Sequence, residues 1–442
     1  MDTSHLHEYP RPDFQRAGLT WSSLNRQWDF VFDDNDVGLE QLWQKHGLPH
    51  RVVVTPSHHD NSSAFQTTQK IAAQPEKLSI NNVHDQSKAD KVYKKQQINV
   101  PFVFQTTASG INNHDAHEVV WYERNIPDIR GENIHQHHDR LLLRFGAVDY
   151  EATLWLDGEY IGSHRGGHVP FDVDITDAIE GKPFARVTIR VRDSPYDLTQ
   201  PRGKQYWAAK PESIFYTPST GIWQSVWLES VPSTRMAESS YGTVLRSDDI
   251  ESGELHAEVA LLGRRTGQEC YVEVEASIAG VAVNKSEKVR VAREQRSAQV
   301  DLDLRFASDM VPESLSLANP LSDSTCWRNG LALWSPEHPL FYDLIIRLYG
   351  NSDELLDEIH TGTGMRSLNW TTGDGTFRLN GQPYFHAVSS LPDLVFSPAS
   401  LAPGASPPEI HPRICVAKSF GCYRVAITTY IACLFPTFLF FS

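Results

Sequence analysis

The chain has 442 residues, which is too long for one hydrophobic core and predicts two or three domains. Its formal net charge of −15 at pH 7 argues against a nucleic-acid partner, since phosphate binding needs a basic face. Apolar residues make up 40% of the chain and methionine is scarce, which is typical of a β-rich globular protein. The many aromatic residues suit either packing between sheets or stacking on sugars.

The five cysteines predict neither a disulfide framework nor a zinc site, because they are odd in number and widely spaced. The sequence likewise suggests no cofactor. Residues 1–18 mix His, Glu, Asp and Arg and contain no apolar run of the kind found in a secretory signal. We therefore expect a cytosolic protein.

Short strands at regular spacing predict a β-sandwich or jelly roll, which we place at residues 1–232. We expect a hairpin over residues 18–32 with its turn at Asn25-Arg26, and a polar surface insertion at about 55–97. Asp157-Gly158 is a tight-turn signal between two strands. Further strands are expected in these segments: 119–126, 140–148, 152–162, 171–176, 185–192 and 221–229.

A second series of strands predicts an immunoglobulin-like sandwich over residues 233–370. A loop is expected at 307–330. The strands of this domain are expected in the following segments: 255–262, 270–278, 287–291, 298–304 and 344–349. We find no internal repeat and no long amphipathic helix.

The last segments differ in character from the rest of the chain. Residues 375–387 resemble a short hairpin, so 371–387 is expected to be the start of a further domain. From Val388 onward the pattern changes, and residues 388–442 end in an apolar stretch.

Four segments together resemble family 2 glycoside hydrolases, the superfamily of β-galactosidase, β-glucuronidase and β-mannosidase. They are the run from Arg144 to Thr176, the tryptophans that flank Leu24-Asn25, the run Thr217 to Glu229, and the run Leu333 to Leu344. The resemblance covers about residues 12–387 in the domain order of the family. It implies a sugar-binding jelly roll, then an immunoglobulin-like domain, then a catalytic (β/α)8 barrel.

The resemblance also implies hydrolysis of O-glycosyl bonds by two glutamates of the barrel. Retaining hydrolysis needs two carboxyl groups about 5–5.5 Å apart, one of them protonated. The family places its acid/base in an Asn-Glu pair, and this chain contains no Asn-Glu pair. Too few residues follow Ala387 to form a barrel of ~250 residues, so we assign no catalytic residue.

We therefore expect the non-catalytic N-terminal half of a family 2 type glycosidase, without the barrel. The alternative is a stand-alone carbohydrate-binding β-sandwich protein. Carbohydrate is the expected partner, bound weakly, and neither nucleic acid nor membrane is expected. The faces that would pack on a barrel are expected to promote self-association.

One loop carries the candidate substrate-binding residues. In the family, loops of the first domain reach the sugar, and residues 193–207 lie at the matching place. Asp197, Arg202, Lys204, Gln205 and Trp207 are the polar and aromatic types that bind hydroxyls and stack on a pyranose. The alternative is a solvated loop that holds the two sheets together.

Three other motifs favour structural roles. Gly166-Gly167 next to His168 predicts positive φ and close backbone approach rather than ligand binding. His135, His137, His138 and Asp139 superficially resemble a metal cluster, but we expect a solvated loop there. The same holds for His58-His59-Asp60.

The apolar tail allows two interpretations. Residues 425–441 are shorter than the ~20 residues of a bilayer span and contain Pro436, so a tail anchor is the weaker one. Val388-Ser389 can be encoded by GTAAGT, a splice-donor sequence. We therefore expect residues 388–442 to be translated intron or a shifted frame.

Overall fold

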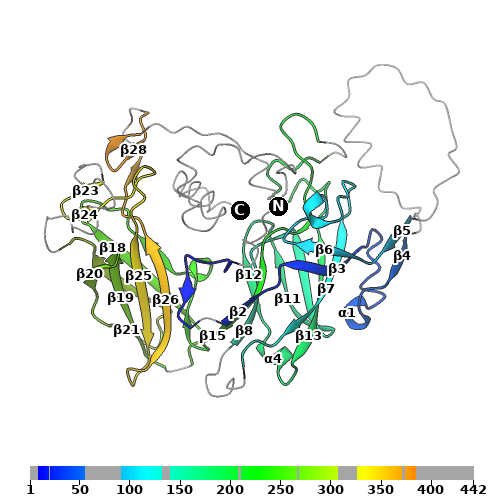
Figure 1. Cartoon of the computed structure of the whole chain (residues 1–442), viewed down its shortest axis with the longest axis horizontal. Helices are drawn as coiled ribbons and strands as arrows, with labels where there is room; N and C mark the ends of the chain where they lie inside the picture. The colour runs from blue at the N-terminus through cyan, green and yellow to red at the C-terminus, as the bar shows by residue number, and fades with distance from the viewer. Residues whose placement is uncertain are drawn as a thin grey trace.

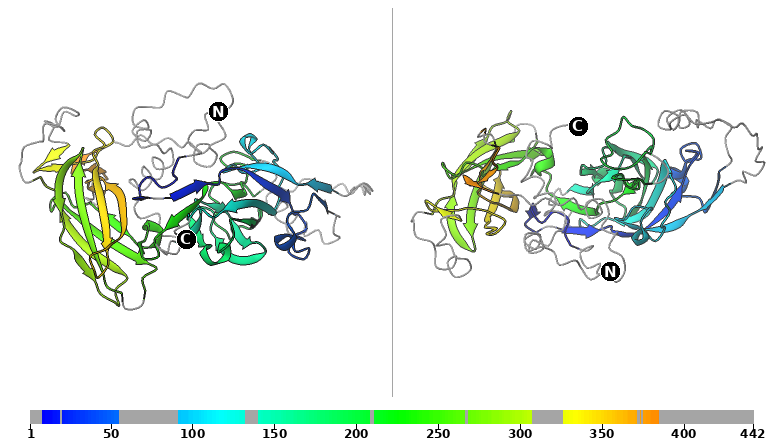
Figure 2. Two further views of the ribbon diagram at one scale, coloured as in Figure 1. Left: turned by 60° about the horizontal axis from the view of Figure 1, so that its bottom comes forward. Right: turned by 90° about the horizontal axis from the view of Figure 1, so that it is seen from above.

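The computed structural model describes residues 8–18, 20–54, 91–131, 140–207, 211–265, 268–306, 326–370, 373 and 375–384. These residues form two β-sandwiches that lie side by side (Figures 1 and 2). The predicted all-β fold class is confirmed. Within the described ranges there is no (β/α)8 barrel, and the α-helices are the single turns α1 (Trp43–His46) and α4 (Thr176–Ile179).

The first sandwich packs two antiparallel sheets face to face. One sheet has six strands in the order β11-β10-β13-β7-β3-β6, and the other has four in the order β12-β8-β15-β2. The strands of the larger sheet are β3 (Arg26–Phe32), β6 (Gln96–Val100), β7 (Val119–Pro127), β10 (Glu151–Leu156), β11 (Glu159–Arg165) and β13 (Phe184–Arg192). Those of the smaller sheet are β2 (Thr20–Ser23), β8 (Arg140–Phe145), β12 (Phe171–Asp174) and β15 (Val226–Val231).

Minor elements complete this domain. They are β4 (Arg51–Val54) paired with β5 (Lys91–Lys94), β9 (Val148–Asp149) paired with β14 (Gly221–Ile222), and the 3-10 turn η2 (Thr107–Ser109).

Alternating apolar residues explain the packing of the first sandwich. Val187, Ile189 and Val191 of β13 alternate along the strand and are fully buried in the core between the sheets. The predicted turn at Asp157-Gly158 is confirmed: it joins β10 to β11 with φ angles of 49° and 87°. Positive φ at both residues gives the twist that a two-residue hairpin needs.

Two sequence predictions for this domain are wrong. Residues 18–32 are not a hairpin, because β2 pairs with β15 whereas β3 pairs with β6 and β7 in the opposite sheet. The chain crosses between the sheets at Leu24-Asn25, where Trp28 Nε1 donates to Leu24 O at 2.8 Å. The predicted insertion at 55–97 ends too late, since β5 and β6 occupy residues from Lys91 on.

The second sandwich also has two sheets. One follows the order β1-β26-β25-β19-β20 with β21 paired to β19, and the other joins β16, β17 and β22 to β18. Its strands are β1 (Gln15–Arg16), β16 (Arg235–Met236), β17 (Val244–Arg246), β18 (Glu254–Leu262), β19 (Cys270–Ile278), β20 (Val281–Lys285), β21 (Val289–Val291), β22 (Ser297–Asp303), β25 (Tyr342–Tyr349) and β26 (Leu355–Thr363). The turn η3 (Ser239–Tyr241) and the pair β23 (Trp327–Arg328) and β24 (Leu331–Ala332) belong to the same region.

The strands β20 and β26 were not predicted from the sequence. β26 carries Asp357, Glu358 and His360 among its apolar residues, so its alternation is weak in the sequence. It nevertheless pairs with β25 along its whole length. Pairing with β25 therefore makes β26 a strand, although the local sequence pattern does not reveal it.

The N-terminal segment also departs from the prediction that residues 1–232 form one domain. Gln15 and Arg16 of β1 pair with His360 and Ile359 of β26, in the second sandwich. Phe14 is buried in the core of that sandwich. Residues 14–16 therefore belong to the second sandwich, although they precede the strands of the first in the sequence.

A small three-stranded sheet ends the described chain. It consists of β27 (Leu368–Asn369), β28 (Arg378–Leu379) and β29 (Gln382–Pro383). The predicted hairpin is confirmed over its described part, with Asn380 and Gly381 at φ 52° and 78° in the turn. Residues 385–442 lie outside the described residues, and the intron and tail-anchor hypotheses concern that segment.

Candidate functional site

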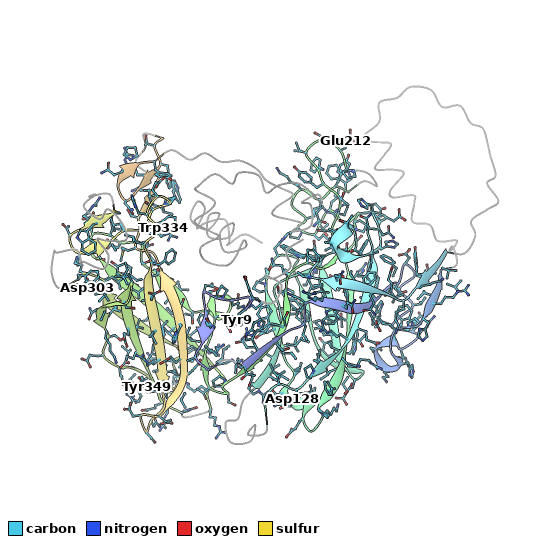
Figure 3. All side chains as sticks on the ribbon, viewed as in Figure 1. Tyr9, Asp128, Glu212, Asp303, Trp334 and Tyr349 are labelled. Carbon is cyan, nitrogen blue, oxygen red and sulfur yellow. The ribbon has the colours of Figure 1, made fainter. Side chains whose placement is uncertain are left out.

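The candidate site is the loop between β13 and β14, residues 193–220. Figure 3 labels Glu212 of this loop at one end of the first sandwich, and Asp128 at the opposite end. Trp334 of the second sandwich lies toward the same end as Glu212 in this view. The loop therefore projects from one end of the domain, where the strand-to-strand connections gather.

A buried carboxyl group anchors the start of this loop. Asp193 follows the last residue of β13 and is 3% exposed. It accepts hydrogen bonds from Thr220 Oγ1 at 2.7 Å and from Gln200 Nε2. These contacts tie the beginning of the loop to its end.

A second buried carboxyl group lies beneath the loop. Asp149 ends β9 and is 2% exposed. Its Oδ2 accepts from Gln205 Nε2 at 2.8 Å, and Gln205 Oε1 accepts from Ser219 N at 2.7 Å. Gln205 thus joins the loop to the sheet below it at Asp149, and it joins two parts of the loop through Ser219.

The backbone approaches Asp149 closely at Gly167. A Cβ built on Gly167 would lie 2.3 Å from Asp149 Oδ1, which no side chain could tolerate. Gly167 O accepts from Trp223 Nε1 at 2.6 Å. The expectation that the paired glycines serve close backbone approach is confirmed.

The two carboxyl groups hold their protons more tightly than ordinary aspartates. Burial raises the pKa of Asp149 well above its usual range, and the nearby charge of Asp193 raises it further. Burial also raises the pKa of Asp193, and its hydrogen bonds from Thr220 and Gln200 oppose the shift. Two carboxyl groups that share a buried site favour one retained proton.

The structure divides the five predicted binding residues into two groups. Gln205 points inward to Asp149, and Arg202 donates to the carbonyls of Ser194 at 3.0 Å and Pro195 at 2.5 Å. Asp197 accepts from Thr199 N at 2.8 Å within a tight turn. These three residues hold the loop in shape.

Lys204 and Trp207 form the second group, because their side chains are exposed. Trp207 is 36% exposed and lies edge-on to Phe215, with ring centroids 5.0 Å apart. Tyr206 stacks on Phe215 at 5.2 Å, so three aromatic rings form a cluster on the loop. Of the five predicted residues, these two are the exposed ones.

The sequence prediction missed Asp149 and Asp193. Each is a polar residue directly after an apolar strand segment, which is a signal that the sequence contains. Their proximity could not be read from the sequence, because it depends on how β9 and β13 meet in the fold.

The arrangement supports loop positioning rather than acid/base chemistry. Both carboxyl groups are nearly inaccessible, and each is bound by neutral donors from its own domain. A glycosidic bond needs accessible carboxyl groups on opposite sides of the sugar. Asp149 and Asp193 do not meet that requirement in this structure.

The described residues contain neither a metal-ligating cluster nor a membrane-spanning helix. Over the part of the chain that the structure describes, no group of three or more His, Cys, Asp or Glu side chains could hold a metal ion. None of the helices described is long and apolar enough to cross a bilayer. The histidine clusters at 58–60 and 135–139 lie outside the described residues.

Comparison with known proteins identifies relatives of this architecture. The family model for glycosyl hydrolases family 2 matches residues 242–366. The chain is 23% identical over 269 residues to a β-galactosidase of Thermoanaerobacter pseudethanolicus, covering 60% of this chain and 30% of that protein. It is 24% identical over 298 residues to a β-glucuronidase of Felis catus, covering 62% of this chain and 39% of the relative.

Solved structures share the fold of the chain. A β-glucuronidase from Ruminococcus gnavus in complex with D-glucaro-d-lactam aligns with a TM-score of 0.52 and 16% identity, covering 83% of this chain and 48% of that one. The chain thus spans between about a third and a half of the length of these relatives. The family match over residues 242–366 and the relatives thus make the chain similar to members of glycoside hydrolase family 2.

Proposed function

We propose that this chain is the non-catalytic, sugar-binding and immunoglobulin-like half of a family 2 glycosidase and does not itself hydrolyse O-glycosyl bonds. The observation that carries the proposal is coverage: two β-sandwiches account for the described residues and align with 48% of the β-glucuronidase from Ruminococcus gnavus. In such an assignment, the two sandwiches support and position a catalytic domain.

The chemistry of the described residues supports the same proposal. Hydrolysis needs an acid and a nucleophile or base on accessible carboxyl groups. The buried pair Asp149 and Asp193 is bound within the loop and the sheet. The printed sequence also lacks the Asn-Glu pair that the resemblance places at the acid/base position.

Hydrolysis by the purified 442-residue chain tests the proposal. The chain is incubated with nitrophenyl β-galactoside, β-glucuronide and β-mannoside, and release of nitrophenol is followed over hours. We expect no release above that of a mock purification from the same host. Turnover that co-elutes with the chain on size exclusion and scales with its concentration would refute the proposal.

A stand-alone carbohydrate-binding protein is the second candidate function. The exposed Trp207 and Lys204 of one loop favour it, since aromatic faces and hydrogen-bond donors are the groups that bind a sugar ring. In the accessory role, sugar binding by this half alone is weak. Calorimetric titration with methyl glycosides separates the two, because a sub-millimolar Kd supports the stand-alone role.

A further inference from the structure

The N-terminal segment crosses the junction between the two sandwiches. Tyr9, which Figure 3 labels between them, packs edge-on against Trp21 at 5.4 Å and donates from its hydroxyl to Glu229 Oε2 at 3.3 Å. Seven residues on, Arg16 pairs with β26 of the second sandwich. We call residues 9–17 the strap.

The strap is bound to the second sandwich by backbone and core contacts. Phe14 packs in the core of that sandwich. Ala17 N donates to Glu358 O at 2.9 Å, and Thr361 Oγ1 donates to Asp13 O at 2.6 Å. The strap therefore extends the sheet at the edge of β26.

Arg16 connects the strap to both sandwiches at once. Its Nη1 lies 3.2 Å from Glu229 Oε1, on β15 of the first sandwich. Its Nε lies 3.3 Å from Asp357 Oδ1, on β26 of the second. Nη2 donates to Met236 O at 2.6 Å, just after the linker between the domains. The guanidinium group is 2% exposed, so these contacts are dry.

A second arginine meets the same carboxylates from the first sandwich. Arg144 on β8 places Nε 2.8 Å from Glu229 and Nη2 2.6 Å from Glu238. Glu238 also lies 3.4 Å from Arg16. Two arginines from different segments thus share two carboxylates across the junction.

The charges of the junction balance. Burial alone would raise the pKa of Glu238, but the guanidinium groups of Arg144, Arg16 and Arg11 outweigh it and lower the pKa to about 2. The buried charged side chains are three arginines and three carboxylates: Arg16, Arg144, Arg235, Glu229, Glu238 and Asp357. Arg11 and Asp172 lie at their edge, and both side chains are 13% exposed.

A buried network of this kind is a costly way to join two domains. Removing six charges from water costs more than burying apolar side chains, and the gain from their pairing depends on geometry. The benefit is specificity, because the Arg16 guanidinium group meets Glu229, Asp357 and the carbonyl of Met236 in one relative position of the two sandwiches. An apolar contact would tolerate sliding and rotation.

We propose that the strap is a conformational device in which Arg16 fixes the orientation of the two sandwiches and couples their opening. Each sandwich has its own core, one built around β13 and β7 and the other around β19 and β25. Arg16 of the strap contacts carboxylates of both sandwiches. Loss of Arg16 therefore frees the junction and leaves each core folded.

Hydrogen–deuterium exchange on the full chain tests this inference, with Arg16→Met as the variant. We expect peptides covering 9–17, 229–238 and 355–363 to exchange about tenfold faster or more, as for a locally opened segment. Peptides from β7, β13, β19 and β25 keep the protection of the parent protein. Arg16→Lys keeps the charge but lacks the planar guanidinium group. We expect its exchange rates at the three junction peptides to lie between those of the parent and those of Arg16→Met.

Arg192→Met is the matched control, because Arg192 pairs with Glu118 at 2.8 Å on an exposed surface of the first sandwich. We expect its exchange at the three junction peptides to equal that of the parent. Unchanged exchange in Arg16→Met would overturn the proposal. So would equal loss of protection over both cores, or the same junction effect in Arg192→Met.

Discussion

Gln205 Nε2 donates to Asp149 Oδ2 at 2.8 Å, and the same side chain accepts from Ser219 N through Oε1 at 2.7 Å. One amide group therefore fixes the loop 193–220 to the sheet at Asp149 and closes the loop on itself at Ser219. Its neighbour Lys204 is exposed, so adjacent residues of the loop have opposite roles.

Gln205→Leu should destabilise the protein, because it removes the hydrogen-bond donor to Asp149 and the acceptor for the backbone N–H of Ser219. Leaving buried polar groups unsatisfied costs about 1–3 kcal/mol. We expect a fall of that size in the free energy of unfolding, measured by urea denaturation. Lys204→Ala is the control and should change it by less than about 0.5 kcal/mol. Equal effects of the two substitutions would contradict the assigned roles.

Asp149→Asn should stabilise the protein at neutral and alkaline pH. The folded state raises the pKa of Asp149 above its ordinary value of 3.8, chiefly through burial. Such a group favours folding at pH values below 3.8, and its contribution is lost as the pH rises toward the folded-state pKa. The amide keeps an acceptor for Gln205 and carries no charge.

The measurement is the free energy of unfolding of Asp149→Asn and the parent at pH 5 and pH 8. We expect the variant to gain about 1–3 kcal/mol relative to the parent at pH 8, and less at pH 5. Asp177→Asn is the control, since the side chain of Asp177 is 83% exposed. A variant less stable than the parent at pH 8 would show that the Asp149 charge is compensated.

Gly167→Ala should disturb the site through steric overlap. The added methyl group would lie 2.3 Å from Asp149 Oδ1, and overpacking of this kind costs about 1–3 kcal/mol. Gly181→Ala tests backbone strain alone, because Gly181 has φ +73° and nothing within 4 Å of the added carbon. We expect Gly181→Ala to cost about 1 kcal/mol. Combining Gly167→Ala with Asp149→Ala should recover part of the loss in thermal unfolding.

Trp207→Ala should weaken whatever sugar binding the chain has, because Trp207 exposes an aromatic ring at the end of the domain. Saturation-transfer NMR with methyl galactoside and methyl glucuronide measures the contact. We expect a reduced signal for Trp207→Ala and an unchanged signal for Trp370→Ala, a residue 43% exposed outside the loop. The same loss in both variants would place the contact elsewhere.

Local turn chemistry made part of the fold predictable from the sequence. Asp157-Gly158 adopts positive φ at both residues, and its hairpin was expected from this pair. Asn25-Arg26 misled the prediction, because a polar pair between apolar runs suits a hairpin as well as a crossing between sheets. Long-range pairing decides between the two.

The strap could not be predicted, because Arg16 and its partner Asp357 are 341 residues apart in the sequence. A strand of two residues also has no periodicity to detect. For the site, the resemblance identified the loop, but sequence alone could not show that Gln205 turns inward and Trp207 outward. That choice depends on the buried carboxyl group of Asp149 beneath the loop.

The most direct test of the central claim is covalent labelling of a catalytic carboxylate. Retaining glycosidases form a covalent glycosyl intermediate, which 2-deoxy-2-fluoro glycosides with a good leaving group trap. The purified 442-residue chain is incubated with the galactosyl, glucuronyl and mannosyl reagents, and its intact mass is measured. The account predicts the unmodified mass in every case. A chain carrying one fluoroglycosyl group, attached to a single Asp or Glu, would contradict it.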